Sequence, residues 1–144
     1  MRRRSSQERL VFNDIEIIDI AEEGKGVGKT DDLVLFIEKA IPGDVVDVEL
    51  MRKKKSFGEG RIQTLKKASE HRVDPFCEHF GVCGGCKWQH MTYDAQLSFK
   101  QQSVENALSR IGKVDTSSME PILASKETEY YRNKLEYTFS NKKW

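Results

Sequence analysis

Residues 33–50 read Leu33-Val34-Leu35-Phe36-Ile37-Glu38-Lys39-Ala40-Ile41-Pro42-Gly43-Asp44-Val45-Val46-Asp47-Val48-Glu49-Leu50, and they carry the clearest structural signals in the chain. The apolar run at residues 33–37 is short enough to be one buried β-strand. Residues 41–44 are typical of a type II turn, because proline stands at the second position and glycine at the third. Beyond the turn, Val46, Val48 and Leu50 alternate with acidic residues, which is the period of a strand. The segment therefore predicts two strands on either side of a tight turn.

The flanking sequence predicts further short strands. Residues 10–20 are rich in Ile, Val and Phe, and a last strand is expected at residues 60–65. The glycine-punctuated residues 22–29 lack the strand–loop–helix context and the Lys-Ser/Thr ending of a phosphate-binding loop, so we expect a flexible hairpin connection there. Five strands in about sixty residues are too few for a β-sandwich and suit a small closed barrel of the OB type. The open face of such a barrel commonly binds single-stranded nucleic acid.

The overall composition is that of a soluble globular protein. The chain has 144 residues, of which 33% are charged and 38% apolar, and its formal net charge is +1. This length allows one ordinary domain or two small ones, and the small net charge gives no indication of a nucleic-acid partner. No apolar run is long enough to cross a membrane, and the arginines after Met1 are not followed by the apolar region of a signal peptide. We therefore expect a cytoplasmic protein.

A strongly basic segment covers the connection between the last two expected strands and the last of these strands itself. Residues 51–67 contain seven Lys or Arg residues and one acid, Glu59, which gives a local charge of +6. Such cations attract a phosphate backbone, and an exposed Phe57 could stack on a base. The alternative is a solvated basic hairpin with Phe57 tucked into the core. The candidate RNA-contacting residues of the barrel are Lys25, Lys29, Arg52, Lys53, Lys54, Lys55, Phe57 and Arg61.

All the cysteines of the chain lie within ten residues, in the pattern Cys77-x5-Cys83-Gly84-Gly85-Cys86. An odd number of thiols in a chain without secretion signals argues against a disulfide framework and for a metal site. The glycines allow the backbone to fold tightly around a metal centre. We therefore take Cys77, Cys83 and Cys86 as candidate metal ligands.

The spacing of the thiols leaves the metal open. Iron–sulfur clusters usually take four cysteine thiolates, and this chain has three. Zinc accepts three cysteines and one histidine, and His79 and His90 are both close in the sequence. The absence of a fourth cysteine indicates that the site continues beyond Trp144.

A helix is expected after the cysteines, over residues 93–111. Thr92 is a suitable N-cap, Asp94 lies in the first turn, and Gly112 is a natural stop. An apolar stripe on one face is expected to be core or interface, and its members are Tyr93, Leu97, Val104, Leu108 and Ile111. From Lys134 the sequence alternates with period two, which predicts a strand that begins just before the chain ends.

These features divide the chain near residue 68. Residues 1–67 are expected to form the barrel. Residues 68–144 are expected to contain the cysteine segment, the helix and the start of a small α/β domain.

Both parts resemble one known family. Residues 1–67 look like a TRAM domain, the OB-like RNA-binding module of several RNA-modifying enzymes. The matching stretches are Gly24-Lys25-Gly26-Val27-Gly28, Phe36-Ile37 and Ile41-Pro42-Gly43-Asp44-Val45-Val46. A second motif is similar to the bacterial RNA uracil-5-methyltransferases that carry an iron–sulfur cluster. It reads Cys77-x-His79-Phe80-Gly81-x-Cys83-Gly84-Gly85-Cys86-x-Trp88-Gln89-His90-x-x-Tyr93-x-x-Gln96-Leu97-x-x-Lys100, and Tyr131-Arg132-Asn133-Lys134 fits the next segment of that family.

The resemblance implies a cofactor and a reaction. In this family, three cysteines at this spacing and a fourth well downstream hold a 4Fe–4S cluster, so Cys77, Cys83 and Cys86 would be its first three ligands. Members of full length end in a Rossmann-like domain that binds S-adenosylmethionine, which is absent from this chain. A cysteine thiolate there adds to uracil C6, C5 takes the methyl group, and a base removes the C5 proton. The resemblance therefore implies no catalytic residue among these 144 residues, and it adds Arg132 and Lys134 to the candidate RNA contacts.

The sequence thus predicts the N-terminal region of a cytoplasmic methyltransferase that acts on uracil C5 in RNA, with 23S rRNA as the favoured target. The fragment alone is expected to be inactive. The alternative is a non-enzymatic RNA-binding module with a zinc site of three cysteines and one histidine. Radical S-adenosylmethionine methylthiotransferases also combine a TRAM domain with a cluster, but their TRAM domain follows the cluster-binding domain. Their three cysteines are three and two residues apart, whereas the gaps in this sequence are five and two.

Overall fold

The computed structural model describes residues 10–21, 23–131, 133 and 134. It divides into two compact units, one ending at Arg72 and the other starting at Val73. The first unit contains the barrel strands, and the second contains the cysteine segment and the helix. The candidate contact Arg132 and most of the strand predicted from Lys134 lie outside the described residues.

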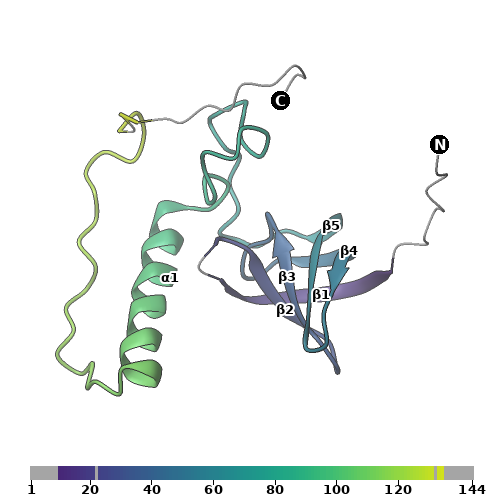
Figure 1. The fold of residues 1–144 in the computed structure, drawn as a ribbon. Helices are drawn as coiled ribbons and strands as arrows, with labels where there is room; N and C mark the ends of the chain where they lie inside the picture. Colours follow the sequence, from purple (N-terminus) through teal and green to yellow (C-terminus); the bar gives the residue numbers. More distant parts are fainter. Residues whose placement is uncertain (1–9, 22, 132, 135–144) are drawn as a thin grey trace. The chain divides into compact units, whose positions relative to one another are not determined.

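The first unit is a closed five-stranded barrel (Figure 1). Its strands are β1 (Val11–Ile20), β2 (Gly26–Lys29), β3 (Val34–Glu38), β4 (Val45–Lys53) and β5 (Phe57–Lys67). The order around the barrel is β1-β2-β3-β5-β4, and β3 and β5 are the parallel pair. The β-rich class and the five-stranded OB-like barrel predicted from the sequence are confirmed.

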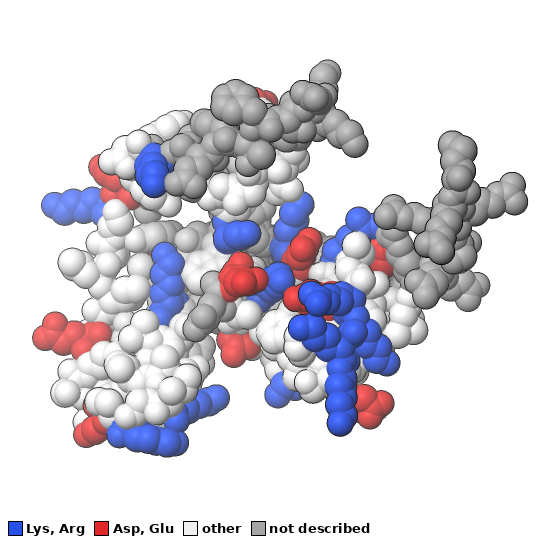
Figure 2. Space-filling model, viewed as in Figure 1, with Lys and Arg blue, Asp and Glu red and all other residues white. Residues whose placement is uncertain are grey.

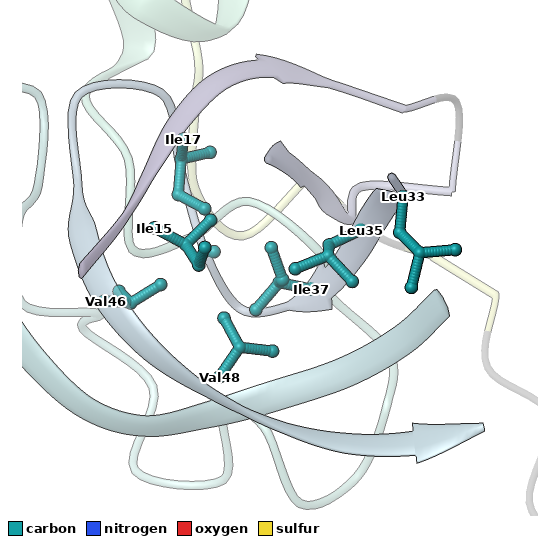
Figure 3. Packing of buried hydrophobic residues seen from close by; sticks show 8 residues of the cluster. Ile15, Ile17, Leu33, Leu35, Ile37, Val46 and Val48 are labelled. Atoms are coloured by element: carbon teal, nitrogen blue, oxygen red, sulfur yellow. The ribbon is translucent and has the colours of Figure 1, made fainter. Parts of the chain in front are cut away.

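The barrel interior is filled by branched aliphatic side chains (Figure 3). Leu35 and Ile37 on β3 and Val46 and Val48 on β4 have no exposed surface, and Ile17 on β1 is 1% exposed. Residues two apart on a strand share a face, so this alternation directs one side of each strand inward. Burial of these side chains is the main favourable contribution to folding of the unit.

The predicted type II turn is present. Gly43 has a φ of +89°, and the amide of Asp44 donates to the carbonyl of Ile41 at 3.1 Å. Glycine adopts this left-handed conformation without steric cost, which explains its place at the third position of the turn. The turn leads the chain directly into β4.

The prediction of a flexible connection was wrong for residues 26–29, which form β2. A Cβ atom on Gly26 would lie 2.7 Å from the carbonyl oxygen of Ala40, and one on Gly28 would lie 2.4 Å from Cγ2 of Ile15. Both glycines are buried, so they are required by close packing across the barrel. Local sequence could not reveal this, because the atoms that exclude a side chain come from other segments.

Gly26→Ala is therefore expected to lower the free energy of unfolding by about 1–3 kcal/mol, since the added methyl group meets backbone atoms. A Gly→Ala change without such a clash would stabilise the chain slightly through the unfolded state. Urea unfolding of the chain gives the comparison, with Lys29→Ala, an exposed change on the same strand, as control. Equal stability of Gly26→Ala and the unmodified chain would show that the close approach to Ala40 is wrong.

Residues beyond β5 are attached to the barrel through Asp44, which is fully buried. Its carboxylate accepts hydrogen bonds from the amides of Ile41 and Ser69, both at 2.9 Å. It also accepts from Nε of Arg72 at 3.1 Å and forms an ion pair with the Nη2 group of Arg72. These bonds explain why the first unit extends to Arg72, beyond the boundary expected at Lys67.

The second unit contains the helix α1 (Tyr93–Asn106), followed by a short π-helical segment, η1 (Ala107–Ile111). The start predicted from Thr92 agrees with the structure, although the Thr92 side chain makes no capping hydrogen bond. Gly112 ends the helix in a right-handed conformation, and the left-handed residue expected of a glycine stop is Lys113, with a φ of +54°. None of the described helices has the length and apolar character needed to span a lipid bilayer.

The apolar stripe predicted on this helix is only partly covered. Tyr93 and Leu97 are half-buried. Val104 is 51% exposed and Ile111 is 84% exposed, so the second half of the stripe is not part of a core within the described residues. That this second half of the stripe forms an interface stays a prediction.

Candidate nucleic-acid interface and cysteine segment

The outer face of β3 and β5 carries an aromatic pair. The parallel register places Val34 beside Phe57 and Phe36 beside Glu59. The rings of Phe36 and Phe57 meet edge to face, with centroids 5.6 Å apart and planes at 81°. Both residues are half-buried, so each ring has partners in the protein and surface open to solvent. A half-exposed aromatic surface on an OB-type barrel is suited to stacking with nucleic-acid bases.

Phe57 is neither fully exposed nor tucked into the core, the two alternatives that its sequence left open. The ring is outside the aliphatic core of the barrel, which consists of other residues. It is also not fully exposed, because Phe36 covers part of it and Nζ of Lys54 lies 5.0 Å from its centroid. The lysine thus brings a positive charge to the edge of the aromatic pair.

Several predicted cations of the barrel have no carboxylate partner among the described residues. Lys29 at the end of β2, Lys53 at the end of β4 and Lys55 in the β4–β5 connection are exposed. None of the three forms an ion pair with a residue that the structure describes. Figure 2 shows Lys and Arg side chains gathered over the barrel, with carboxylates among them. These lysines can meet phosphate groups without first losing a partner.

Other predicted cations are already paired. Nζ of Lys25 lies 3.6 Å from Glu59, and an Nη atom of Arg52 lies 3.9 Å from the same carboxylate. Nε of Arg61 bonds to Glu49 at 2.6 Å. Sequence reasoning counted all of these residues as positive charges, although on the folded barrel their charge is partly compensated. Strand register, which the sequence does not show, decides which of them are paired.

The structure leaves the three cysteines as free thiols. Cys77 is half-buried, whereas Cys83 and Cys86 are exposed. Within the described part of the chain, no three His, Cys, Asp or Glu side chains lie close enough together to hold a metal ion. The assignment of Cys77, Cys83 and Cys86 as metal ligands therefore stays a prediction.

The surroundings of the thiols nevertheless fit thiolate ligands. The amide of Gly85 donates to Sγ of Cys83 at 3.4 Å. The side chain of Gln89 connects the other two cysteines, because its Oε1 accepts from the amide of Cys77 at 3.0 Å and its Nε2 lies 3.9 Å from Sγ of Cys86. Donors aimed at sulfur stabilise metal-bound thiolates, and a set of soft sulfur ligands suits iron–sulfur clusters or zinc. Sequence reasoning missed this role of Gln89, although its place three residues after Cys86 was visible.

The two histidines near the cysteines lie in different environments. His79 has a side chain that is 65% exposed, with Nε2 3.6 Å from the carboxylate of Glu78. His90 is 3% exposed, and its ring packs on Phe80 with centroids 5.0 Å apart. Exposure makes His79 the more accessible of the two to a metal ion.

The second unit also has a hollow of about 790 Å³ that the sequence did not reveal. Its lining includes Cys86, Trp88 and Tyr93, and Nζ of Lys100 lies 5.7 Å from the centroid of the Trp88 ring. The segment after the helix reaches this hollow, where the amide of Ser125 donates to the hydroxyl of Tyr93 at 2.8 Å. The hollow places aromatic surface and two cations, Lys87 and Lys100, beside the cysteine segment.

Comparison with known proteins identifies the barrel. Residues 13–62 match the TRAM domain family, in agreement with the resemblance seen in the sequence. Over 130 residues the chain is 53% identical to a Porphyromonas gingivalis protein named an uncharacterized RNA methyltransferase, and the match covers 90% of this chain and 28% of the relative. A protein of the same name from Bacteroides thetaiotaomicron is 50% identical over 125 residues, with 87% and 28% covered.

A third relative has a more specific name. The 23S rRNA (uracil(1939)-C(5))-methyltransferase RlmD of Francisella tularensis subsp. novicida is 42% identical over 120 residues, and the match covers 83% of this chain and 27% of that protein. The chain is therefore a homologue of bacterial RNA methyltransferases, which confirms the resemblance seen in its sequence. It spans little more than a quarter of the length of these relatives.

Proposed function

We propose that this chain is the RNA-binding and cluster-binding part of an S-adenosylmethionine-dependent methyltransferase that acts on uracil C5 in 23S rRNA. The observation that carries the proposal is the half-exposed Phe36–Phe57 pair, with Nζ of Lys54 5.0 Å from the Phe57 ring, on the outer face of a barrel that matches the TRAM family. The names of the relatives support the reaction class.

RNA would bind across β3 and β5. An unstacked base lies on the aromatic pair, while Lys29, which pairs with Val34 beside Phe57, contacts a neighbouring phosphate. Stacking accepts any base, so the aromatic rings by themselves do not select one base over another. The lysines add an attraction that weakens as salt concentration rises.

The cysteine segment would hold a 4Fe–4S cluster, with Cys77, Cys83 and Cys86 as three ligands and the fourth outside these residues. A bound cluster would crosslink the segment through these three thiolates. Gln89 holds the backbone of Cys77 and reaches Sγ of Cys86, so it keeps these two ligands in fixed relation.

The methyl transfer itself needs groups that these residues do not supply. A nucleophile, a base and the S-adenosylmethionine site would lie in the remaining part of the protein, which we expect to be Rossmann-like. The described chain would bind and orient the RNA so that the target uridine can leave its stack. Alone it is expected to bind RNA weakly and to methylate nothing.

Phe57→Ala is expected to weaken binding of the chain to single-stranded RNA roughly tenfold, because base stacking contributes about 1–3 kcal/mol per base. Fluorescence anisotropy with a labelled RNA oligonucleotide measures the change, and thermal unfolding shows whether the variant remains folded. The matched control is Ile18→Ala, which removes an exposed apolar side chain from β1 of the same barrel. Unchanged affinity of a folded Phe57→Ala variant would contradict the proposed binding face.

A further inference from the structure

Glu59 occupies an unexpected place on the proposed RNA-binding face. It is the single acid among residues 51–67 and lies on β5 between Phe57 and Arg61. The ladders place it beside Phe36 of β3 and opposite Arg52 of β4. Its side chain is 34% exposed. A carboxylate in the middle of a surface that binds a polyanion repels phosphate, so its presence there calls for a function.

Two cations hold this carboxylate in position. Lys25 approaches one oxygen to 3.6 Å, and Arg52 approaches the other to 3.9 Å. Lys25 is shared with Glu23, at 3.5 Å. The two cations reduce the repulsion that the carboxylate exerts on phosphate, because each lies within a few ångströms of it. The carboxylate can therefore remain charged on this face.

The acceptor sites of Glu59 remain open. Both of its ion-pair distances exceed the usual length of an N–H···O hydrogen bond, in contrast to the 2.6 Å contact between Arg61 and Glu49. No described residue donates a hydrogen bond to the Glu59 carboxylate. An ionised carboxylate accepts hydrogen bonds and donates none, so the open sites select ligand groups that carry N–H or O–H.

We propose that Glu59 is a specificity-determining residue that makes the TRAM face prefer guanine over uracil at the base stacked beside Phe36. Guanine presents two adjacent donors, N1–H and the N2 amino group, which match the two carboxylate oxygens. The corresponding edge of uracil has one N–H between two carbonyl oxygens, and these repel the carboxylate. The inference rests on the proposed RNA-binding function of this face.

The test compares two single-stranded RNA oligonucleotides that are identical except for one central base, guanine or uracil, in anisotropy titrations of the chain. The unmodified protein is expected to bind the guanine RNA about tenfold more tightly, which is the discrimination typical of a well-formed bidentate contact. Glu59→Gln should bring the two affinities within about twofold of each other, because an amide cannot accept two hydrogen bonds in this way. Glu16→Gln, an exposed change on β1, is the matched control and should keep the preference.

The possible outcomes separate the inference from the function on which it rests. If Glu59→Gln strengthens binding to both RNAs equally, the carboxylate only repels phosphate and the inference is wrong. If the unmodified chain binds both RNAs equally well, the inference fails and the RNA-binding function stands. If it binds neither RNA at low salt, the proposed function fails, and the inference fails with it.

Discussion

Asp44→Asn is expected to lower the free energy of unfolding by about 3–5 kcal/mol, which is the usual cost of removing one partner of a buried ion pair. Asp44 has no exposed surface and accepts from Ile41, Ser69 and Arg72. An asparagine keeps one acceptor oxygen and turns an NH₂ group toward these donors. The loss affects both the type II turn and the segment that follows β5.

Urea unfolding of the two proteins measures this difference, provided that the slope of the unfolding free energy against urea is unchanged. The control is Asp19→Asn on β1, an exposed aspartate whose carboxylate bonds only to the adjacent amide of Ile20 among the described residues. That change should cost less than about 1 kcal/mol. Similar effects of the two substitutions would show that the buried network around Asp44 is not formed.

The same carboxylate gives the fold a dependence on pH. Burial alone would raise the pKa of Asp44, but the hydrogen bonds from Arg72, Ile41 and Ser69 outweigh it, so the pKa lies below its ordinary value of 3.8. A carboxyl group with a lowered folded-state pKa stabilises the protein above its unfolded-state pKa, and this stabilisation is lost as the pH falls. The loss is expected to begin near pH 4 and to continue below it. Asp44→Asn should show a weaker decline of stability over this range.

The second large effect concerns the cysteines. Iron and acid-labile sulfide are each expected at about four per chain in any longer gene product that supplies a fourth cysteine, purified anaerobically, as for a cluster held by four cysteines. Cys83→Ser should remove most of the iron, because serine is a poor ligand for such a cluster. The control is Val82→Ser, which introduces the same hydroxyl one residue away at a side chain that is 68% exposed.

Metal analysis distinguishes this result from the alternative site. Stoichiometric zinc without sulfide would contradict the cluster and favour a zinc site of three cysteines and one histidine, with the exposed His79 as the accessible fourth ligand. Retention of iron by Cys83→Ser would show that the cysteine segment is not where iron binds.

The barrel was largely predictable because its signals are local. The alternation of Val46, Val48 and Leu50, the apolar run before it and the turn at Gly43 all lie within one short segment, and the structure agrees with each. The strand β2 was missed for the opposite reason. Its glycines are typical of a loop by composition, whereas the atoms that require them belong to Ile15 and Ala40. Packing between distant segments is not visible in a local pattern.

The binding face was only half predictable. The basic segment and Phe57 could be recognised from composition, but Phe36 stands in a continuous apolar run in which inward and outward residues look alike. Strand register brings Phe36 beside Phe57 and places Glu59 next to Lys25 and Arg52. The bond between Asp44 and Arg72 likewise joins residues 28 positions apart, so nothing in the neighbouring sequence indicates it.

The outer face of β3 and β5 is the proposed RNA-binding surface. The most direct test is ultraviolet cross-linking of the chain to single-stranded RNA, followed by identification of the cross-linked residues by mass spectrometry. The account predicts cross-links at Phe36 and Phe57 that disappear when unlabelled RNA competes. Cross-links confined to β1, or found only in the unit that starts at Val73, would contradict it.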